Sequence, residues 1–295
     1  MRHKHNVTKT NKLKAQINEP KLWIKKFPWK KLLEHKYSRG KAVIYGGKKE
    51  FTGATILAAE ASLRTGVGSV KIICNKDTLQ IYSLKFPSVL KCEINNLINF
   101  KKFIKREKIT SILIGPGSGV SKKIKEITKF ILKKVKYVVV DADALTCFKG
   151  DLKTLYSLLD KHKIITPHLG EFHKIFPKIK KKISRVDKAL NAVKLIKSNI
   201  ILKGSNTIIV SYDKKVVINK HASPELAVIG SGDVLSGLVL SLIGEGKMNP
   251  SLAACAAVWL HGDISKNFDK GLIAEDIVRG IPDALKRLKN EYTIE

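Results

Sequence analysis

The 295-residue chain is 44% hydrophobic and 27% charged, which is typical of a globular protein with one large or two ordinary domains. Its formal net charge of +31, from 56 basic and 25 acidic residues, invites a nucleic-acid-binding interpretation. However, 49 of the basic residues are Lys and only 7 are Arg, the side chain better suited to reading bases and clamping phosphates. The lysines are scattered and Ile is frequent, so a general compositional bias explains the charge better.

The cysteines argue against a zinc site or a disulfide framework. Cys74, Cys92, Cys147 and Cys255 lie far apart and form no Cys-x-x-Cys pair, which fits a reducing cytoplasm. The Lys-rich N-terminus lacks the apolar core and cleavage site of a secretory signal. We therefore expect a cytoplasmic protein.

Residues 226–244 are apolar enough to raise the question of a membrane span. Asp233 and several glycines lie inside this run, and a charge at membrane depth is costly. The run is therefore interpreted as a buried helix, and no membrane partner is expected.

The chain begins with a polar, basic stretch at residues 1–20, which we expect to be an arm outside the domain. Residues 21–36 carry Trp23, Phe27 and Trp29 among lysines and are expected to pack onto it as a short element. No composition break or internal repeat follows, so residues 21–295 are predicted to form a single domain.

The first regular pattern is a βαβ unit. A buried-strand pattern at 41–46 ends in two glycines, an apolar helix follows at 55–65, and a second strand is predicted at 69–74. The glycines do not have the Gly-x-Gly-x-x-Gly spacing of dinucleotide-binding folds, so that interpretation is weak. Residues 75–108 are locally uninformative.

The remaining strands and helices alternate. Strands are predicted at 109–114, 137–141, 163–166 and 200–204, with a hairpin over 207–219. Helices are predicted at 122–134, 184–197, 250–265 and 274–288, in addition to the apolar run after Gly232. This alternation predicts an α/β protein whose mainly parallel central sheet carries helices on both faces.

Chemistry-bearing residues follow several of the predicted strands. A glycine cluster at 115–119 would let backbone approach a ligand closely, although a tight turn explains it equally well. Asp141 and Asp143 end the strongest strand, where open α/β sheets bind ligands, but either could cap the next helix. His168 and Glu171 lie on a loop after the next strand and could meet ligand, metal or phosphate, or could be surface residues.

The sequence Gly230-Ser231-Gly232-Asp233 opens the apolar helix near the C-terminus. Small residues at a helix start leave backbone N–H groups accessible, and together with the helix dipole they form an anion site. A carboxylate beside a bound phosphate is unfavourable unless it handles a proton or a metal. Asp233 could also be explained by the dipole alone, which favours acidic residues in the first turn.

Taken in order, these motifs resemble those of the ADP/ATP-dependent NAD(P)H-hydrate dehydratases, members of the ribokinase-like superfamily. The resemblance covers roughly residues 20–290. It rests on the following motifs: His35-Lys36, Gly46-Gly47, the sequences at 51–54 and 63–68, Gly115-Pro-Gly117-Ser-Gly119, Asp141-Ala-Asp-Ala-Leu145, Thr166-Pro-His-Leu-Gly-Glu171, Lys203-Gly204 and Gly230-Ser-Gly-Asp233. It implies a ribokinase-like three-layer α/β/α fold.

The resemblance also implies repair of damaged nicotinamide cofactor. Such enzymes are thought to phosphorylate the ring hydroxyl of NADHX or NADPHX with ADP or ATP and then eliminate phosphate, which restores NAD(P)H. A hydroxyl is a poor leaving group and phosphate a good one, so the site needs a base, an anion cradle and Mg²⁺. The compact single-domain form favours ADP, with AMP as the other product.

The site residues implied by the resemblance fall into three groups. Asp233 is the catalytic base and touches the hydrate, while the amides of 230–232 form the anion cradle. Substrate-binding residues are Ala54, Gly117, His168 and Asp233. Nucleotide-binding residues are Lys203, Gly204, Ser205, Asn206, Thr207 and Gly232, and Glu171 matches an acidic position near Mg²⁺.

The sequence departs from the family pattern in three places. Ala222-Ser223-Pro224 replaces Gly-Asn-Pro, Ile229 replaces a glycine, and the glycine-rich stretch before the first strand is reduced to residues 37–40. Ile229 is bulky and β-branched and therefore poorly suited to positive φ. If it crowds the nucleotide loop, its reversion to Gly should tighten nucleotide binding; unchanged affinity would show that the departure is harmless.

Two other function classes stay open. A ribokinase-like kinase of a small alcohol or vitamin precursor would use the same Gly-Ser-Gly-Asp chemistry. A basic nucleic-acid-binding protein is the second alternative. The resemblance further implies a homo-oligomer, with a tetramer suspected, and NAD(P)H-hydrate epimerase as a functional partner that is not fused here, since residues 1–20 leave no room for it.

Overall fold

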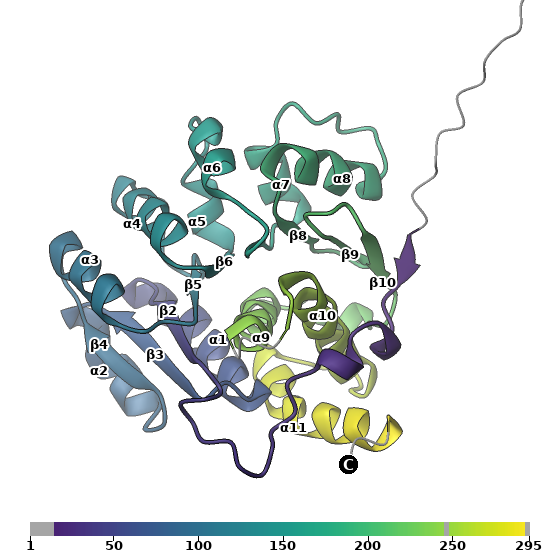
Figure 1. Ribbon diagram of the computed structural model, residues 1–295, viewed down its shortest axis with the longest axis horizontal. Coiled ribbons are helices and arrows are strands. Elements are labelled where there is room, and N and C mark those ends of the chain that lie inside the picture. Colours follow the sequence, from purple (N-terminus) through teal and green to yellow (C-terminus); the bar gives the residue numbers. More distant parts are fainter. Residues whose placement is uncertain (1–14, 245–247, 293–295) are drawn as a thin grey trace, which may run out of the picture.

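A ten-stranded sheet between two helical layers forms the centre of the computed structural model, which describes residues 15–244 and 248–292 (Figure 1). The strand order is β1-β10-β9-β8-β7-β6-β5-β2-β3-β4. The strands are β1 Gln16–Ile17, β2 Lys41–Tyr45, β3 Ser69–Cys74, β4 Leu90–Glu93, β5 Ser111–Ile114, β6 Tyr137–Val140, β7 Lys163–Ile165, β8 Asn199–Leu202, β9 Thr207–Val210 and β10 Val216–Asn219. β9 runs antiparallel to β8 and β10, and the other pairs are parallel.

Two groups of helices cover the two faces of the sheet. One face carries α1 Thr52–Thr65, α2 Lys76–Lys85, α9 Ser231–Gly244, α10 Pro250–Lys266 and α11 Ala274–Glu291. The other carries α3 Leu97–Arg106, α4 Lys122–Lys134, α5 Ala142–Thr146, α6 Leu152–Leu158, α7 Leu169–Ile175 and α8 Arg185–Ile196. Short 3₁₀ turns occur at η1 Pro20–Leu22, η2 Ile24–Lys26, η3 Lys49–Phe51 and η4 Pro224–Leu226.

The continuous apolar strands supply both layers of the core. Successive strand residues point to opposite faces, so Val138 and Val140 join the core under α4 and α8 while Val139 joins the core under α9 and α10. A run such as Tyr137–Val140 has no polar face because helices cover it on both sides.

The strand order reverses between β2 and β5. Chain-consecutive strands run outward from β2 to β4, and then from β5 to β8 on the other side. In open α/β sheets the crevice at such a switch point, outside the carboxyl ends of the strands, is where ligands bind. Here the loops after β2 and β5 meet, because the Lys48 amide donates to the Gly117 carbonyl at 2.9 Å.

Helices α1 and α9 pack in parallel beneath this crevice. A Cβ at Gly237 would lie 2.4 Å from the carbonyl oxygen of Ala58, so only glycine permits this approach. The Ser62 hydroxyl of α1 stabilises this contact by donating a hydrogen bond to the Gly237 carbonyl at 2.9 Å. Ala54 and Asp233 each lie one helical turn nearer the crevice than this contact.

Most predicted elements are confirmed, among them the strand at 69–74, the helix at 122–134 and the hairpin. The mainly parallel sheet with helices on both faces is likewise confirmed. The uninformative stretch at 75–108 contains α2, β4 and α3, whose short length and mixed composition hid their periodicity. The apolar run at 226–244 forms the buried helix α9 from residue 231 onward, while residues 226–230 precede it. None of the described helices has the length and apolarity to cross a membrane.

The basic arm was expected to reach residue 20, but residues 16–18 belong to the domain. Residues 1–14 lie outside the described part of the chain. β1 pairs with β10 along the sheet edge. Asn18 is buried and donates to Asn219 Oδ1 at 2.9 Å and to the Cys255 carbonyl at 2.8 Å. Polar composition misled the prediction, because the buried side chain of Asn18 is satisfied by hydrogen bonds rather than by water.

Candidate functional site

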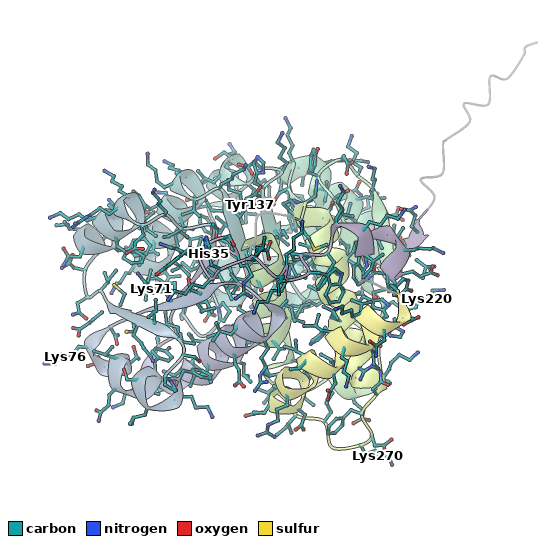
Figure 2. The ribbon with its side chains drawn as sticks, turned by 60° about the horizontal axis from the view of Figure 1, so that its bottom comes forward. His35, Lys71, Lys76, Tyr137, Lys220 and Lys270 are labelled. Atoms are coloured by element: carbon teal, nitrogen blue, oxygen red, sulfur yellow. The ribbon has the colours of Figure 1, made fainter. Side chains whose placement is uncertain are left out.

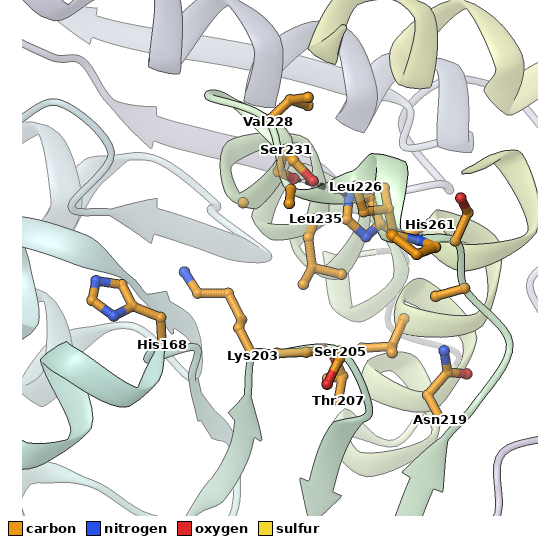
Figure 3. A pocket seen from close by; sticks show the side chains of 17 residues that line it. His168, Lys203, Ser205, Thr207, Asn219, Leu226, Val228, Ser231, Leu235 and His261 are labelled. Carbon is orange, nitrogen blue, oxygen red and sulfur yellow. Dashed lines mark hydrogen bonds between the residues drawn. The ribbon is translucent and has the colours of Figure 1, made fainter. Parts of the chain in front are cut away.

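A pocket of about 570 Å³ lies between the loop after β8 and the N-terminal end of α9 (Figure 3). This volume is within the range of small-molecule sites. Lys203 extends into the space between His168 on one side and Leu235 on the other. The pocket is lined by His168, Lys203, Gly204, Ser205, Thr207, Asn219, Ala222, Ser223, Pro224, Leu226, Ala227, Val228, Ser231, Gly232, Leu235, Val258 and His261.

One arginine fixes the loop after β8. The Arg185 guanidinium, from the first turn of α8, donates to the carbonyls of Leu202 and Lys203 at 3.1 and 2.9 Å and to that of Asn206 at 3.1 Å. Gly204 adopts φ +158 with guanidinium atoms less than 3 Å from where a Cβ would stand. The loop is therefore shaped before any ligand arrives.

The start of α9 offers two free amides to the pocket. Gly230 has φ +86, and a Cβ there would lie 2.6 Å from Leu57 Cδ1, so this turn requires glycine. The Ser231 amide donates to the Val228 carbonyl at 3.3 Å and the Asp233 amide to the Gly230 carbonyl at 3.0 Å. Within the described ranges, the amides of Gly230 and Gly232 meet no acceptor. The expected cradle of three amides is thus reduced to these two.

A buried histidine orients Ser231. His261 Nε2 lies 3.0 Å from the Ser231 carbonyl oxygen and 3.1 Å from its hydroxyl. Because a carbonyl can only accept, Nε2 carries the proton in this arrangement. Burial lowers the pKa of His261 to about 4, so the ring stays neutral near physiological pH and acts as a fixed donor.

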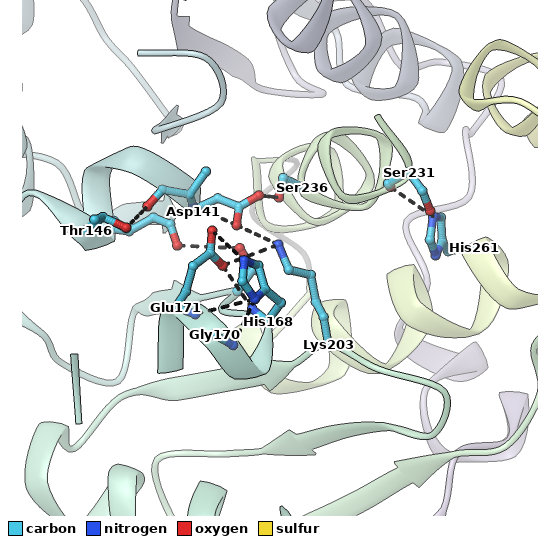
Figure 4. A network of polar contacts seen from close by, with 12 residues as sticks. Asp141, Thr146, His168, Gly170, Glu171, Lys203, Ser231, Ser236 and His261 are labelled. Atoms are coloured by element: carbon cyan, nitrogen blue, oxygen red, sulfur yellow. Dashed lines mark hydrogen bonds and ion pairs between the residues drawn. The ribbon is translucent and has the colours of Figure 1, made fainter. Parts of the chain in front are cut away.

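An ammonium group lies among buried carboxylates at the inner end of the pocket (Figure 4). Lys203 Nζ is 2.9 Å from Asp141 Oδ1 and 4.0 Å from Glu171 Oε2. Asp141 is 2% exposed, and its second oxygen accepts from the Ser236 hydroxyl at 2.6 Å. Ala142, immediately after Asp141, has φ +45, a strained conformation for alanine that the surrounding structure must hold.

The charges of this cluster set the pKa of Asp233. Burial raises its pKa to about 7, the negative charge of Asp141 adds to the rise, and Lys203 opposes it. Burial alone would lower the pKa of Lys203, but Asp141 and Glu171 outweigh it and raise that pKa. Asp233 is therefore poised to exchange a proton near neutral pH, whereas Lys203 stays charged.

His168 and Glu171 cap α7 reciprocally. His168 Nδ1 accepts from the amides of Gly170 and Glu171 at 2.9 and 3.4 Å, while Glu171 Oε2 accepts from the His168 amide at 2.9 Å. Both residues thus have a structural role. His168 also lines the pocket, and burial raises the pKa of Glu171 beside Lys203.

The other predicted site residues divide between two places. Gly204, Ser205, Thr207 and Gly232 line the pocket with Lys203, whereas Asn206 does not. Ala54 and Gly117 do not line it either. The backbone of Gly117 lies against Phe51, at the switch-point crevice near the start of α1. Asp233 lies between the two places, within electrostatic reach of Lys203 and Asp143.

The site does not contain a protein cage for a metal ion. In residues 15–244 and 248–292, no three His, Cys, Asp or Glu side chains are close enough to hold one. Mg²⁺ is commonly bound through substrate phosphates, waters and only one or two carboxylates. Glu171 and Asp141 fit that kind of donor set.

Ile229, a departure from the family pattern, is not among the residues that line the pocket. Its side chain is 100% exposed, and it is not among the described non-glycine residues with positive φ. Gly230 makes the turn instead. Ser223 is also accommodated, because its amide donates to Ser265 Oγ at 3.0 Å and its hydroxyl caps η4.

Sequence reasoning missed the residues that hold the site together. Arg185 and His261 act on backbone carbonyls that are distant in sequence, so no local pattern identifies them. The apolar wall at 222–228 was considered only as a departure from a motif. Asn219 was placed in the hairpin without a role, although it lines the pocket and accepts from Asn18.

The central sheet between two helical layers defines a ribokinase-like α/β fold, and two free amides at the start of α9 adjoin its pocket. A sequence profile described as NAD(P)H-hydrate dehydratase matches residues 42–281. The chain therefore belongs to the NAD(P)H-hydrate dehydratase family.

Relatives and solved structures agree with this assignment. The chain is 31% identical to an ADP-dependent (S)-NAD(P)H-hydrate dehydratase of Neisseria meningitidis over 269 residues, 88% of each protein. It is 33% identical over 268 residues, 85% of its length, to a bifunctional NAD(P)H-hydrate repair enzyme of Dictyoglomus turgidum, and this alignment spans about half (51%) of that protein. The fold matches a Bacillus subtilis ADP/ATP-dependent NAD(P)H-hydrate dehydratase co-crystallized with ATP/Mg²⁺ (TM-score 0.78, 24% identity, 93% of this chain and 99% of that one).

Replacing Asp233 by Asn is expected to stabilise the fold at alkaline pH. Because the folded-state pKa lies near 7 and the ordinary value is 3.8, ionisation costs the folded state stability between these values, and the full cost applies above about pH 7. Asp233→Asn removes that cost, which is roughly 1.4 kcal/mol per pKa unit. Thermal unfolding should show a Tm gain of several degrees near pH 8 that shrinks toward pH 4. Asp283→Asn, on the exposed face of α11, is the matched control; an equal gain there, or none for Asp233, contradicts the assignment.

Proposed function

We propose that this protein is an ADP-dependent (S)-NAD(P)H-hydrate dehydratase, which restores NADH or NADPH from their hydrates with release of AMP and phosphate. The observation that carries the proposal is the position of Asp233. A carboxylate with a pKa of about 7 stands one residue after a free amide at the start of α9. Family membership and the names of the relatives support the substrate and the phosphoryl donor.

The nucleotide occupies the 570 Å³ pocket in this proposal. Its phosphates meet the amides of Gly230 and Gly232, where the positive end of the α9 dipole favours an anion. A Cβ at Gly232 would be 3.4 Å from Lys203 Nζ, so the ammonium stands close beside this cradle. The adenine ring of the nucleotide lies against the apolar wall formed by Leu226, Val228 and Val258.

Asp233 acts on the hydroxyl of the hydrated ring. It accepts the hydroxyl proton as the oxygen attacks the terminal phosphoryl group, and an apparent pKa near 7 suits a group that must accept and release a proton at neutral pH. Ala54 and Gly117, at the switch-point crevice, place the ring on the side of Asp233 away from the nucleotide. His168 forms part of the boundary between the two substrates.

The transferred phosphoryl group turns the hydroxyl into a leaving group. Attack on the β-phosphoryl of ADP releases AMP and leaves a phosphate ester on the ring. Cleavage of the C–O bond then releases inorganic phosphate, and the adjacent ring carbon loses a proton to the departing phosphate, which restores the double bond of the reduced nicotinamide. Lys203 and the two free amides stabilise negative charge on the transferring group, which is the main task of a phosphoryl-transfer site.

Mg²⁺ in this proposal arrives with the nucleotide. Bound Mg²⁺ neutralises phosphate charge during transfer. Glu171, with Asp141 behind it, would hold the ion by carboxylate oxygens or through water. In this structure the ammonium of Lys203 lies between these two carboxylates. The epimerase partner, the homo-oligomer and the cytoplasmic location stay predictions of the same proposal.

Absorbance at the reduced-nicotinamide band tests the proposal directly. Purified protein with NADHX and Mg²⁺ should give a rise in absorbance when ADP is added, with one phosphate and one AMP formed per cofactor restored. A separate cuvette with ATP determines the preferred donor. A stable phosphorylated small alcohol without any restored cofactor would instead identify a kinase of that alcohol and overturn the proposal.

The role of Asp233 is tested by Asp233→Asn in the same assay. Turnover should fall by several orders of magnitude, because the amide cannot accept the proton, while the fold and nucleotide affinity stay close to those of the parent protein. Asp283→Asn, the same substitution on an exposed surface, should retain full activity. Near-normal turnover of Asp233→Asn would exclude Asp233 as the base.

A further inference from the structure

A second pocket, of about 260 Å³, lies at the opposite edge of the sheet from the first. Its lining includes the amino ends of β2, β3 and β4, at Lys41, Ser69 and Leu90, together with Ile109 just before β5. The loop before β2, at residues 36–37, closes one side. Figure 2 brings this edge forward and labels His35 and Lys71. No residue given a role in the proposed reaction lines this pocket. Lys36, Leu63 and Gly68, which belong to two of the motifs behind the family resemblance, do line it.

The pocket carries an excess of positive charge. Lys36, Lys41 and Lys71 line it, and Glu107 is the one acidic residue among its described lining. Glu107 pairs with Lys71 at 3.1 Å. Lys36 and Lys41 have no carboxylate partner in the described part of the chain, so two positive charges remain uncompensated.

Both ammonium groups lie near one aromatic ring. Lys36 Nζ lies 5.1 Å and Lys41 Nζ 5.7 Å from the centroid of the Tyr37 ring. Cation–π attraction of this kind is modest at exposed sites and does not neutralise either charge. An anion in the pocket is therefore attracted by both ammonium groups.

The loop before β2, which carries Lys36 and Tyr37, is held in place by contacts with residues 66–68 and 244. Arg39 donates to the Gly66 carbonyl at 2.7 Å, and the Gly68 amide donates to the Arg39 carbonyl at 3.0 Å. Gly40, with φ +84, lies so close to Gly244 that a Cβ would be 2.1 Å from its carbonyl oxygen. The pocket is therefore formed without a ligand. Lys36 and Lys41 are on a loop and a strand start rather than in the last turn of a helix, so helix-dipole compensation does not account for them.

The remaining lining is mostly apolar, with Ser69 and Ser88 as its polar residues. Ala42, Val43, Leu63 and Ile109 form the inner wall behind the lysines. A bare inorganic anion would leave this wall in contact with water. A ligand with a charged end and a compact apolar body satisfies both halves of the pocket.

We propose that this second pocket binds a small organic anion whose phosphate or carboxylate group is held by Lys36 and Lys41 and whose apolar body lies against Leu63 and Ile109. The site is separate from the pocket of the proposed reaction and does not depend on that function.

Calorimetric titration with phenyl phosphate at low ionic strength tests this proposal. The parent protein should bind phenyl phosphate more tightly than inorganic phosphate, since only the former has an apolar body, and benzoate compares carboxylate with phosphate as the charged end. The variant Lys36→Gln/Lys41→Gln should weaken phenyl phosphate binding at least tenfold while its affinity for ADP is unchanged. Lys76→Gln/Lys270→Gln, which removes two exposed charges labelled in Figure 2, is the matched control.

Three results would overturn the proposal. The first is that both double variants weaken phenyl phosphate binding equally, which would mean that the effect comes from the overall charge of the protein. The second is phenyl phosphate affinity that Lys36→Gln/Lys41→Gln leaves intact, which places binding elsewhere. The third is equal affinity for phenyl phosphate and inorganic phosphate, which excludes a contribution from the apolar wall.

Discussion

The ion pair between the partly buried ammonium of Lys203 and Asp141 is the interaction on which the site depends. The ammonium stands 2.9 Å from Asp141 and 4.0 Å from Glu171, with Asp233 nearby. Three carboxylates could not all be ionised so close together without it, because like charges in a poorly solvated place repel strongly. Burial raises the pKa of Asp233, Asp141 adds to the rise, and Lys203, which lies closest to Asp141, offsets it only in part. The charge of Lys203 thus affects Asp141, Glu171 and Asp233 to different extents, so these three carboxylates take different roles in the site.

The backbone around this cluster is built from close approaches that only small residues allow. Gly237 lets α9 lie against α1, and Gly230 makes the turn into α9. Arg185 and His261 then hold carbonyls on either side of the pocket. These contacts are made before substrate binds, so the groups that would stabilise a transferring phosphoryl need little reorganisation.

The sequence was sufficient to predict the sheet, most helices and the neighbourhood of Asp233, because buried parallel strands and the Gly-Ser-Gly-Asp turn have strong local patterns. It could not predict which amides of that turn are free, since this depends on the bond from Ser231 to Val228. Nor could it predict that Ile229 points into solvent, because exposure is a property of the folded surface. Residues 16–18 were misassigned because their partners are distant: strand pairing for residues 16–17 and burial of Asn18 come from β10 and α10, more than 190 positions away.

The most direct test of the account is the ionisation of Asp233 itself. Carbon-13 NMR of aspartate carboxyl groups, assigned by comparison with Asp233→Asn, gives its titration curve in the intact protein. The account predicts an apparent pKa near 7 that falls when a cation binds beside it and rises when Lys203 is replaced by Met. A titration near the ordinary value of 3.8, unchanged in Lys203→Met, would contradict the claim that the lysine-centred carboxylate cluster prepares Asp233 for proton transfer.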